Sequence, residues 1–244
     1  MVSRFLPSIP LYHMHIRCFA YIIHIMRKNN SHLRINEIFK SIQGESTYAG
    51  IPCVFVRLTG CNLRCSYCDT TYAYTEGSDM SVNEILNKIE RYGCKNVCIT
   101  GGEPLQQRNV TKLINLLKKN LYKIFVETGG SINIDFLPKS VIRIMDIKCP
   151  DSGMNKEMDW KNIERLKARD EVKFIISSKK DYEWAKRIAR KYKLLDRVQT
   201  LLFGVAHGRL RPKTLAGWIL KDNLDVRFQL QLHKYIWPDK ARGV

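Results

Sequence analysis

The chain of 244 residues is long enough to bury a full hydrophobic core, either as one large domain or as two small ones. Hydrophobic residues make up 45% of it and charged residues 26%, which is the ordinary balance of a soluble globular protein. No apolar run approaches the roughly 20 residues that a membrane span needs, so the composition argues against a membrane protein.

The net charge of +18 raises the question of a nucleic-acid partner. The basic residues are spread along the chain and interleaved with acidic ones, as in residues 161–171, which is typical of solvated helix faces. No recognised nucleic-acid-binding motif accompanies the charge, so we expect no direct nucleic-acid partner. A small anionic substrate would benefit from the same positive field.

The first 34 residues differ from the rest of the chain. They hold four of the six histidines, five basic residues and no acidic residue. Their apolar run, residues 18–26, is interrupted by His24 and lacks a small-residue cleavage site, so we do not expect a secretory signal. Our hypothesis is a poorly ordered leader over residues 1–34, with a translation start upstream of Met26 as one explanation and a transit-like segment as another. Residues 35–244 then form the catalytic domain.

From residue 36 onward, runs rich in Val, Ile and Phe alternate with helical patterns. Residues 81–84 read as a capping box that opens a helix, and Pro212 stands at the start of another. The expected strands cover residues 53–58, 96–100, 123–127, 141–147, 171–177, 197–203 and 226–232, and the expected helices cover residues 82–92, 110–120, 182–192 and 212–221.

Repeated strand–helix units predict an α/β fold with a mostly parallel sheet, either open or curled into a barrel. In such folds, ligands bind at the carboxyl ends of the strands. The informative motifs stand at those ends: residues 60–68 follow the first expected strand, residues 101–104 the second, residues 129–130 the third and Lys148 the fourth. We therefore expect one site assembled by the fold.

Three of the eight cysteines, Cys61, Cys65 and Cys68, lie within eight residues of one another. Without a secretion signal, this spacing indicates metal or redox chemistry in a reducing compartment, which favours a cytoplasmic protein. Three thiolates from one loop can hold a four-iron cubane and leave one iron for a ligand that is not protein. The alternative is a zinc site with a distant fourth ligand, for which the candidates are Cys53, Cys94 and Cys149.

The spacing C-x-x-x-C-x-x-C resembles the signature of the radical S-adenosylmethionine superfamily, in which S-adenosylmethionine chelates the open iron. Residues 101–104, Gly-Gly-Glu-Pro, are similar to the motif that receives the methionine amino group in that superfamily. Glycines permit close backbone approach, and a carboxylate suits an ammonium.

Further stretches resemble one family, the 7-carboxy-7-deazaguanine synthases. They are residues 37–46, 55–58, 68–70 and 231–237, and the resemblance covers residues 36–244. It implies a partial (β/α) barrel and a radical ring contraction of 6-carboxy-5,6,7,8-tetrahydropterin to 7-carboxy-7-deazaguanine and ammonia, for queuosine or archaeosine. It also implies a 4Fe-4S cluster, S-adenosylmethionine, Mg²⁺, a flavodoxin- or ferredoxin-like electron donor and a homodimer.

Site residues follow from the resemblance, position by position. It implies that three cysteines hold the cluster and that Thr70 binds Mg²⁺, which prefers hard oxygen. The cluster ligands are Cys61, Cys65 and Cys68; the expected contacts to S-adenosylmethionine are Tyr67, Cys68, Asp69, Gly102, Glu103, Asp146, Ile147 and Lys148; and the expected pterin site is Ile42, Gln43, Gly44, Arg57, Thr100 and Pro238.

Some readings stay open. Arg57 can instead pair with a buried acid, and Thr70 can cap Asp69 locally. Ser46 stands where the family pattern has glycine, and residues 202–208 lack the Ser-Pro pair expected of a cofactor loop. The alternative functions are an activating enzyme of the same superfamily, which makes a glycyl radical on a partner protein, and a zinc-stabilised RNA-binding module.

Overall fold

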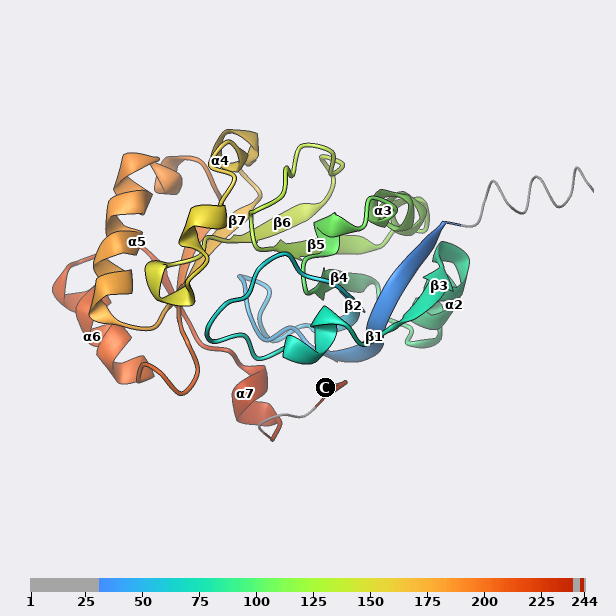
Figure 1. Ribbon diagram of the computed structural model, residues 1–244, viewed down its shortest axis with the longest axis horizontal. Coiled ribbons are helices and arrows are strands. Elements are labelled where there is room, and N and C mark those ends of the chain that lie inside the picture. Colours follow the sequence, from blue (N-terminus) through green and yellow to red (C-terminus); the bar gives the residue numbers. More distant parts are fainter. Residues whose placement is uncertain (1–30, 239–241, 244) are drawn as a thin grey trace, which may run out of the picture.

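The computed structural model describes residues 31–238 and 242–243 (Figure 1). These residues form one sheet of nine strands in the order β3-β1-β2-β4-β5-β6-β7-β8-β9. Neighbours from β2 to β9 run parallel, whereas β1 is antiparallel to both β2 and β3. The strands are β1 (His32–Ile42), β2 (Pro52–Leu58), β3 (Ser78–Ser81), β4 (Asn96–Gly101), β5 (Lys123–Thr128), β6 (Ile142–Asp146), β7 (Glu171–Ile176), β8 (Thr200–Val205) and β9 (Arg227–Gln229).

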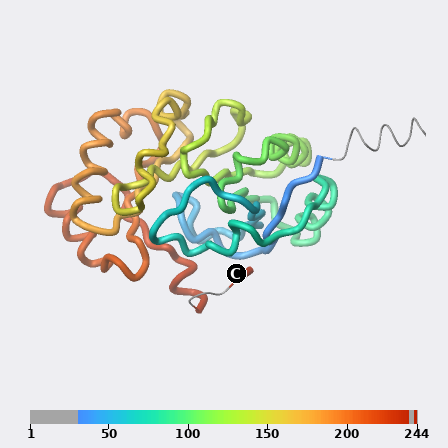
Figure 2. The backbone as a smooth tube through the Cα atoms, viewed as in Figure 1, coloured from blue at the N-terminus to red at the C-terminus, as the bar shows by residue number. Residues whose placement is uncertain are grey.

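The sheet is curved but not closed, so the expected mostly parallel, partial-barrel architecture is confirmed. Figure 2 shows the curved path of the backbone, and the parallel neighbours from β2 to β9 require the chain to return to the same end of the sheet between these strands. The α-helices are α2 (Val82–Arg91), α3 (Val110–Lys119), α4 (Asn162–Arg165), α5 (Lys179–Lys191), α6 (Pro212–Lys221) and α7 (His233–Ile236), and the 3₁₀ helices are η1 (Thr71–Tyr74), η2 (Pro104–Gln106), η3 (Pro150–Ser152), η4 (Asn155–Glu157) and η5 (Leu194–Asp196).

The local signals for two helices are confirmed. At the start of α2, the Ser81 hydroxyl accepts a hydrogen bond from the Glu84 amide, and the Glu84 carboxylate accepts one from the Ser81 amide at 2.7 Å. This capping box satisfies amides that have no partner within the helix. Pro212 is the first residue of α6, where its missing amide hydrogen costs nothing.

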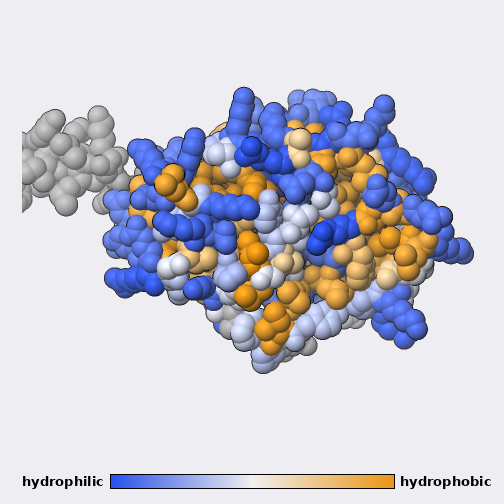
Figure 3. Space-filling model, turned by 180° about the vertical axis from the view of Figure 1, so that it is seen from behind, coloured by the Kyte–Doolittle hydropathy of each residue, from blue (hydrophilic) through white to orange (hydrophobic). Residues whose placement is uncertain are grey.

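Apolar side chains fill both faces of the sheet. One large cluster joins the strands to the amphipathic helices, and a second, smaller one lies on the other face, built around Phe39, Phe55 and Phe125. Cys53 and Cys98 are fully buried in this second cluster, so they act as small hydrophobic residues. On the face opposite to Figure 1, hydrophilic side chains surround central apolar patches (Figure 3).

Several expected boundaries were wrong. Strands β1 and β3 were missed, and β1 begins at His32, so the sheet includes residues 32–34, which we had assigned to the leader. Strand β8 begins at Thr200 because residues 197–199, which follow η5, form a turn and a bend, and β9 is only three residues long. The expectation for residues 1–30 lies outside the described residues. No helix in the part of the chain that the structure describes is long and apolar enough to cross a membrane.

Candidate active site

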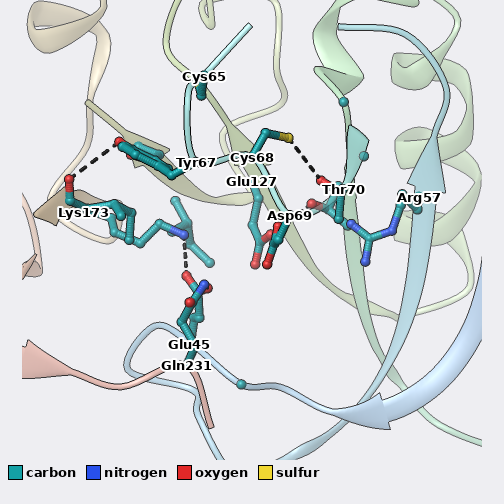
Figure 4. Close-up of a pocket in the computed structure, with 18 of the residues that line it drawn as sticks. Glu45, Arg57, Cys65, Tyr67, Cys68, Asp69, Thr70, Glu127, Lys173 and Gln231 are labelled. Atoms are coloured by element: carbon teal, nitrogen blue, oxygen red, sulfur yellow. Dashed lines mark hydrogen bonds and ion pairs between the residues drawn. The ribbon is translucent and has the colours of Figure 1, made fainter. Parts of the chain in front are cut away.

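A cavity of about 460 Å³ lies at the carboxyl ends of the parallel strands (Figure 4). Its lining comes from the turn after β1, the cysteine loop (residues 60–68), the ends of β4 to β8, and the segment between β9 and α7. All the motifs expected at strand ends therefore surround one space, as the parallel topology requires.

The three clustered thiols share this cavity. Cys61, Cys65 and Cys68 are half-buried and all line it. The loop is held by its own hydrogen bond from the Cys68 amide to the Cys65 carbonyl, at 3.1 Å, and by one from the Ser66 amide to the Ser152 carbonyl, at 3.0 Å. These backbone bonds hold the loop in place, and the Cys61 sulfur also accepts a hydrogen bond from the Leu63 amide at 3.4 Å.

The donor set suits a cluster better than a zinc ion. Cys53 and Cys149 are fully buried and do not line the cavity, and neither does Cys94, so none of the proposed fourth ligands joins the three thiols. Within residues 31–238, no three His, Cys, Asp or Glu side chains converge as ligands of a single ion would. A cubane spreads its cysteine ligands over separate irons, so three thiols spaced around one end of a cavity fit it.

Lys148 places a positive charge beside the thiols. Its ammonium donates to Oδ2 of Asp146 at 2.8 Å, and both side chains line the cavity. Burial disfavours the charged ammonium, but Asp146 and Cys65 outweigh burial and raise the pKa of Lys148. Burial also raises the pKa of the Cys61 and Cys65 thiols, and Lys148 opposes that shift. The site therefore supplies countercharge for thiolates.

Gly102 permits the cysteine loop to pack closely on β4. A Cβ atom at Gly102 would lie 2.1 Å from the Gly60 carbonyl oxygen and 2.8 Å from Cβ of Cys61. Such distances are too short for any other residue, so glycine is required here by the approach of two backbones. Gly102 lines the cavity, as expected.

Glu103 does not face the cavity, contrary to the expectation for a cofactor contact. It is fully buried, and burial raises the pKa of its carboxyl group. Its carboxylate accepts hydrogen bonds from the Gly129 amide at 2.7 Å, the Leu105 amide at 3.1 Å and the Thr128 hydroxyl at 2.9 Å. Glu103 thus ties the end of β5 to the loop after β4.

Five of the six residues expected at the pterin site line the cavity, namely Ile42, Gln43, Gly44, Arg57 and Thr100. Pro238 is exposed and does not line the cavity, so its contact with the pterin stays a prediction. Ile147 is buried outside the lining, and its amide donates to the Lys173 carbonyl at 2.9 Å.

Arg57 both pairs with an acid and faces the cavity. Its Nε donates to Oε1 of Glu37 at 2.6 Å, and the Tyr72 hydroxyl donates to the same oxygen at 3.0 Å. Burial lowers the pKa of Arg57, but Tyr72 and Glu37 outweigh burial and raise it. Neither Nη group donates to any residue that the structure describes, so both can donate to a ligand.

Thr70 points its hydroxyl at the cavity beside the last cysteine. Its Oγ1 lies 3.7 Å from Sγ of Cys68 (Figure 4). Thr70 is the N-cap residue of η1, but its side chain makes no capping bond. The local-capping alternative for this hydroxyl is therefore wrong. Tyr67 and Asp69 line the cavity as expected.

Sequence reasoning missed a group of polar residues opposite the thiols. Glu45 forms an ion pair with Lys173 and accepts from Nε2 of Gln231 at 2.8 Å (Figure 4). Burial raises the pKa of Glu45, but Lys173 and His233 outweigh burial and lower it to about 2. Lys173 was detectable as a charged residue inside the apolar run of β7, and Gln231 begins a stretch that resembles the family, but nothing in the sequence indicated that they meet Glu45.

Glu127 also lies at this end of the cavity. Its Oε2 accepts a hydrogen bond from the Thr100 hydroxyl at 2.9 Å, and both residues line the cavity. Figure 4 shows its carboxylate between the Lys173–Glu45 pair and Arg57. The cavity thus has thiols and Lys148 at one end and an array of carboxylates, amides and cations at the other.

A model of the radical SAM superfamily matches residues 55–205. The 7-carboxy-7-deazaguanine synthase of Koribacter versatilis is 40% identical over 226 residues, covering 87% of this chain and all of that one. The 7-carboxy-7-deazaguanine synthase of Chlorobaculum tepidum is 43% identical, covering 87% of this chain and 97% of that one. The crystal structure of QueE from Escherichia coli shares the fold, with a TM-score of 0.70 and 23% identity over 83% of this chain and 95% of that one.

The fold, the cysteine loop and the matched residues place this chain in the radical SAM superfamily. Enzymes of this superfamily use a 4Fe-4S cluster and S-adenosylmethionine. Within that class, the chain belongs to the 7-carboxy-7-deazaguanine synthase family.

Proposed function

We propose that this chain converts 6-carboxy-5,6,7,8-tetrahydropterin to 7-carboxy-7-deazaguanine and ammonia, on the route to queuosine or archaeosine. Membership of the 7-carboxy-7-deazaguanine synthase family supports this reaction. The observation that carries the proposal is that one cavity holds three thiols at one end and hydrogen-bonding groups suited to a carboxylated pterin at the other.

In this proposal, Cys61, Cys65 and Cys68 hold the 4Fe-4S cluster. When bound, the cluster and S-adenosylmethionine supply a 5′-deoxyadenosyl radical, which removes a hydrogen atom from the pterin. The polar residues near the thiols bind and orient S-adenosylmethionine: Tyr67, Asp69, Gly102, Asp146 and Lys148. All of these line the cavity, which supports the assignment.

At the other end, Arg57 binds the pterin carboxylate. Its Nε is fixed by Glu37 at 2.6 Å, so the guanidinium is oriented before the substrate arrives, and its free Nη groups suit a bidentate contact. Glu127 and Thr100 form hydrogen bonds with the edge of the pterin ring. Their mutual bond at 2.9 Å holds the Glu127 carboxylate in place.

Thr70 would supply one hard oxygen to Mg²⁺ in this proposal. The position of Thr70 between the cysteine loop and Arg57 supports this role (Figure 4). A flavodoxin- or ferredoxin-like protein delivers the electron that reduces the cluster. A homodimer and a cytoplasmic location are parts of the proposal that rest on the family alone.

The test is anaerobic incubation of reconstituted protein with 6-carboxytetrahydropterin, S-adenosylmethionine and dithionite, followed by mass analysis. We expect 7-carboxy-7-deazaguanine to accumulate in excess of the S-adenosylmethionine consumed. Arg57→Met should raise KM, and Arg57→Lys should recover part of the loss, because lysine restores charge without the bidentate geometry. Cleavage of S-adenosylmethionine with the pterin unchanged would instead favour an activating enzyme.

A further inference from the structure

The outer edge of the cysteine loop is exposed to solvent, while its inner edge carries the thiols. Cys61, Leu63 and Cys65 line the cavity, whereas the alternate residues Asn62, Arg64 and Ser66 are exposed. The inner and outer sides of the same short loop therefore face the cluster site and the solvent. An electron that enters here crosses less protein than it would through the sheet.

Two loops without acidic residues meet at this edge. The cysteine loop contains Arg64, and residues 206–213, which follow β8, contain Arg209, Arg211 and Lys213; neither segment contains Asp or Glu. The Arg209 guanidinium donates to the Ser66 carbonyl and hydroxyl, so the two loops touch. All four basic residues are exposed, and we call them the basic rim.

Two members of the basic rim are held in place. Nη1 of Arg64 donates to the Cys61 and Leu63 carbonyls at 2.7 Å, and its guanidinium lies 4.3 Å from the centre of the Tyr74 ring. Arg209 is fixed by Ser66 in the same way. Side chains that are fixed before binding lose less conformational entropy when a partner docks.

The nearest acids do not cancel this charge. Asp69 forms an ion pair with Lys234 at 3.0 Å. Asp151, whose carbonyl accepts a hydrogen bond from the Ser66 hydroxyl, pairs with Lys180 at 3.4 Å. Each acid therefore has its own basic partner, and the charges of the basic rim remain in excess.

We propose that the basic rim is the docking surface for a small acidic protein that carries one electron at low potential. This inference rests on the proposed function, which needs one electron per activation of the cluster. In the transfer, the reduced flavin or iron–sulfur centre of the donor loses one electron and the cluster held by the three thiolates gains it; no bond forms or breaks. Electron-transfer complexes have small interfaces, and charge complementarity steers their encounter.

The test uses the double variant Arg211→Glu with Lys213→Glu. It reverses the charge of the two basic-rim residues that do not hold the cysteine loop in place. The matched control is Lys88→Glu with Lys118→Glu, two exposed lysines on α2 and α3. The probe is an acidic flavodoxin. Its Kd for each variant is measured at low and high salt, and turnover is measured with photoreduced flavodoxin and, separately, with dithionite.

We expect the rim variant to bind flavodoxin roughly tenfold more weakly at low salt and to lose a similar factor in flavodoxin-supported turnover. Added salt should weaken the binding of flavodoxin to wild type and reduce the difference in Kd between wild type and the rim variant, since salt screens exposed charges. Dithionite-supported turnover should be unchanged, and the control should match wild type in every measurement.

Equal Kd values for the rim variant and the control, or equal losses with flavodoxin and dithionite, would overturn the docking surface. A rim variant that loses affinity for a short single-stranded RNA but not for flavodoxin would overturn it too, in favour of a nucleic-acid surface. If wild type is inactive even with dithionite, the proposed function fails instead, and the flavodoxin Kd still decides whether the rim binds an acidic protein.

Discussion

The ammonium of Lys234 lies 3.0 Å from Oδ2 of Asp69, and this ion pair joins the C-terminal helix to the cysteine loop. The segment that carries Lys234 also reaches the opposite wall, where the Leu232 amide donates to the Gly44 carbonyl at 2.9 Å. Helix α7 therefore lines the cavity with His233 and Lys234 and links the turn after β1 to the residues that follow the cysteines.

Lys234→Met should weaken S-adenosylmethionine binding by roughly fivefold, because a partly exposed ion pair contributes about 1 kcal/mol. Lys234→Arg should restore most of the affinity, since it keeps the charge. Isothermal titration of reconstituted protein gives both Kd values, with iron content as the control for an intact loop. Unchanged affinity in Lys234→Met would show that the ion pair does not position the loop.

Cys65→Ala should abolish loading of the four-iron cluster, because two thiolates are too few for it. Cys94→Ala is the matched control, since Cys94 is half-buried but does not line the cavity. Iron and sulfide analysis after anaerobic reconstitution, with the visible absorption spectrum, measures the outcome. Normal iron content in Cys65→Ala would contradict the assignment of the cysteine loop.

Thr70→Ala should slow ring contraction more than cleavage of S-adenosylmethionine. The change removes a hard oxygen from the proposed Mg²⁺ site and leaves the three thiols in place. Product and 5′-deoxyadenosine are followed separately by mass, over a range of Mg²⁺ concentrations. Thr70→Ser keeps the hydroxyl and should behave like wild type; equal loss of both species in Thr70→Ala would remove Thr70 from the metal site.

Glu45→Gln should destabilise the fold by about 3 kcal/mol at pH 7, because it removes the carboxylate that pairs directly with the buried Lys173 ammonium. The pKa of Glu45 is lowered from 4.5 to about 2, so the wild-type pair stabilises the fold fully above about pH 4.5 and loses that contribution as pH falls toward 2. Urea unfolding over this interval should show a smaller pH dependence for Glu45→Gln. Parallel pH profiles for the two proteins would refute the role of the pair.

Ser46→Gly should be more stable than Ser46→Ala by roughly 1 kcal/mol. Ser46 has a φ of 70°, in the left-handed region that favours glycine, and its hydroxyl accepts a hydrogen bond from the Tyr48 amide at 3.1 Å. Both variants lose that hydrogen bond, so the difference between their free energies of unfolding reports the cost of the left-handed backbone conformation. Thermal unfolding of the two proteins measures it, and equal stability would show that the turn relaxes.

The sequence determined the parts of this protein that depend on local spacing. The interval between Cys61, Cys65 and Cys68 is set by covalent connectivity, so it predicts three thiols on one loop whatever the rest of the chain does. Apolar runs followed by motifs likewise predict a parallel sheet with its site at the strand ends, since parallel strands must place those ends together. The capping box of α2 is similarly local, and it was predicted correctly.

Only the tertiary structure decided which distant residues meet. The Glu45–Lys173 pair joins residues 128 positions apart, because the curvature of the sheet brings the turn after β1 next to β7 and β9, which lie far from β1 in the strand order. Glu103 looked like a cofactor contact from its motif, but the approach of β5 buries it against Thr128 and Gly129. Strand β1 escaped prediction because its alternation follows a leader of unusual composition, and its antiparallel pairing with β2 depends on the register of the sheet rather than on any nearby residue.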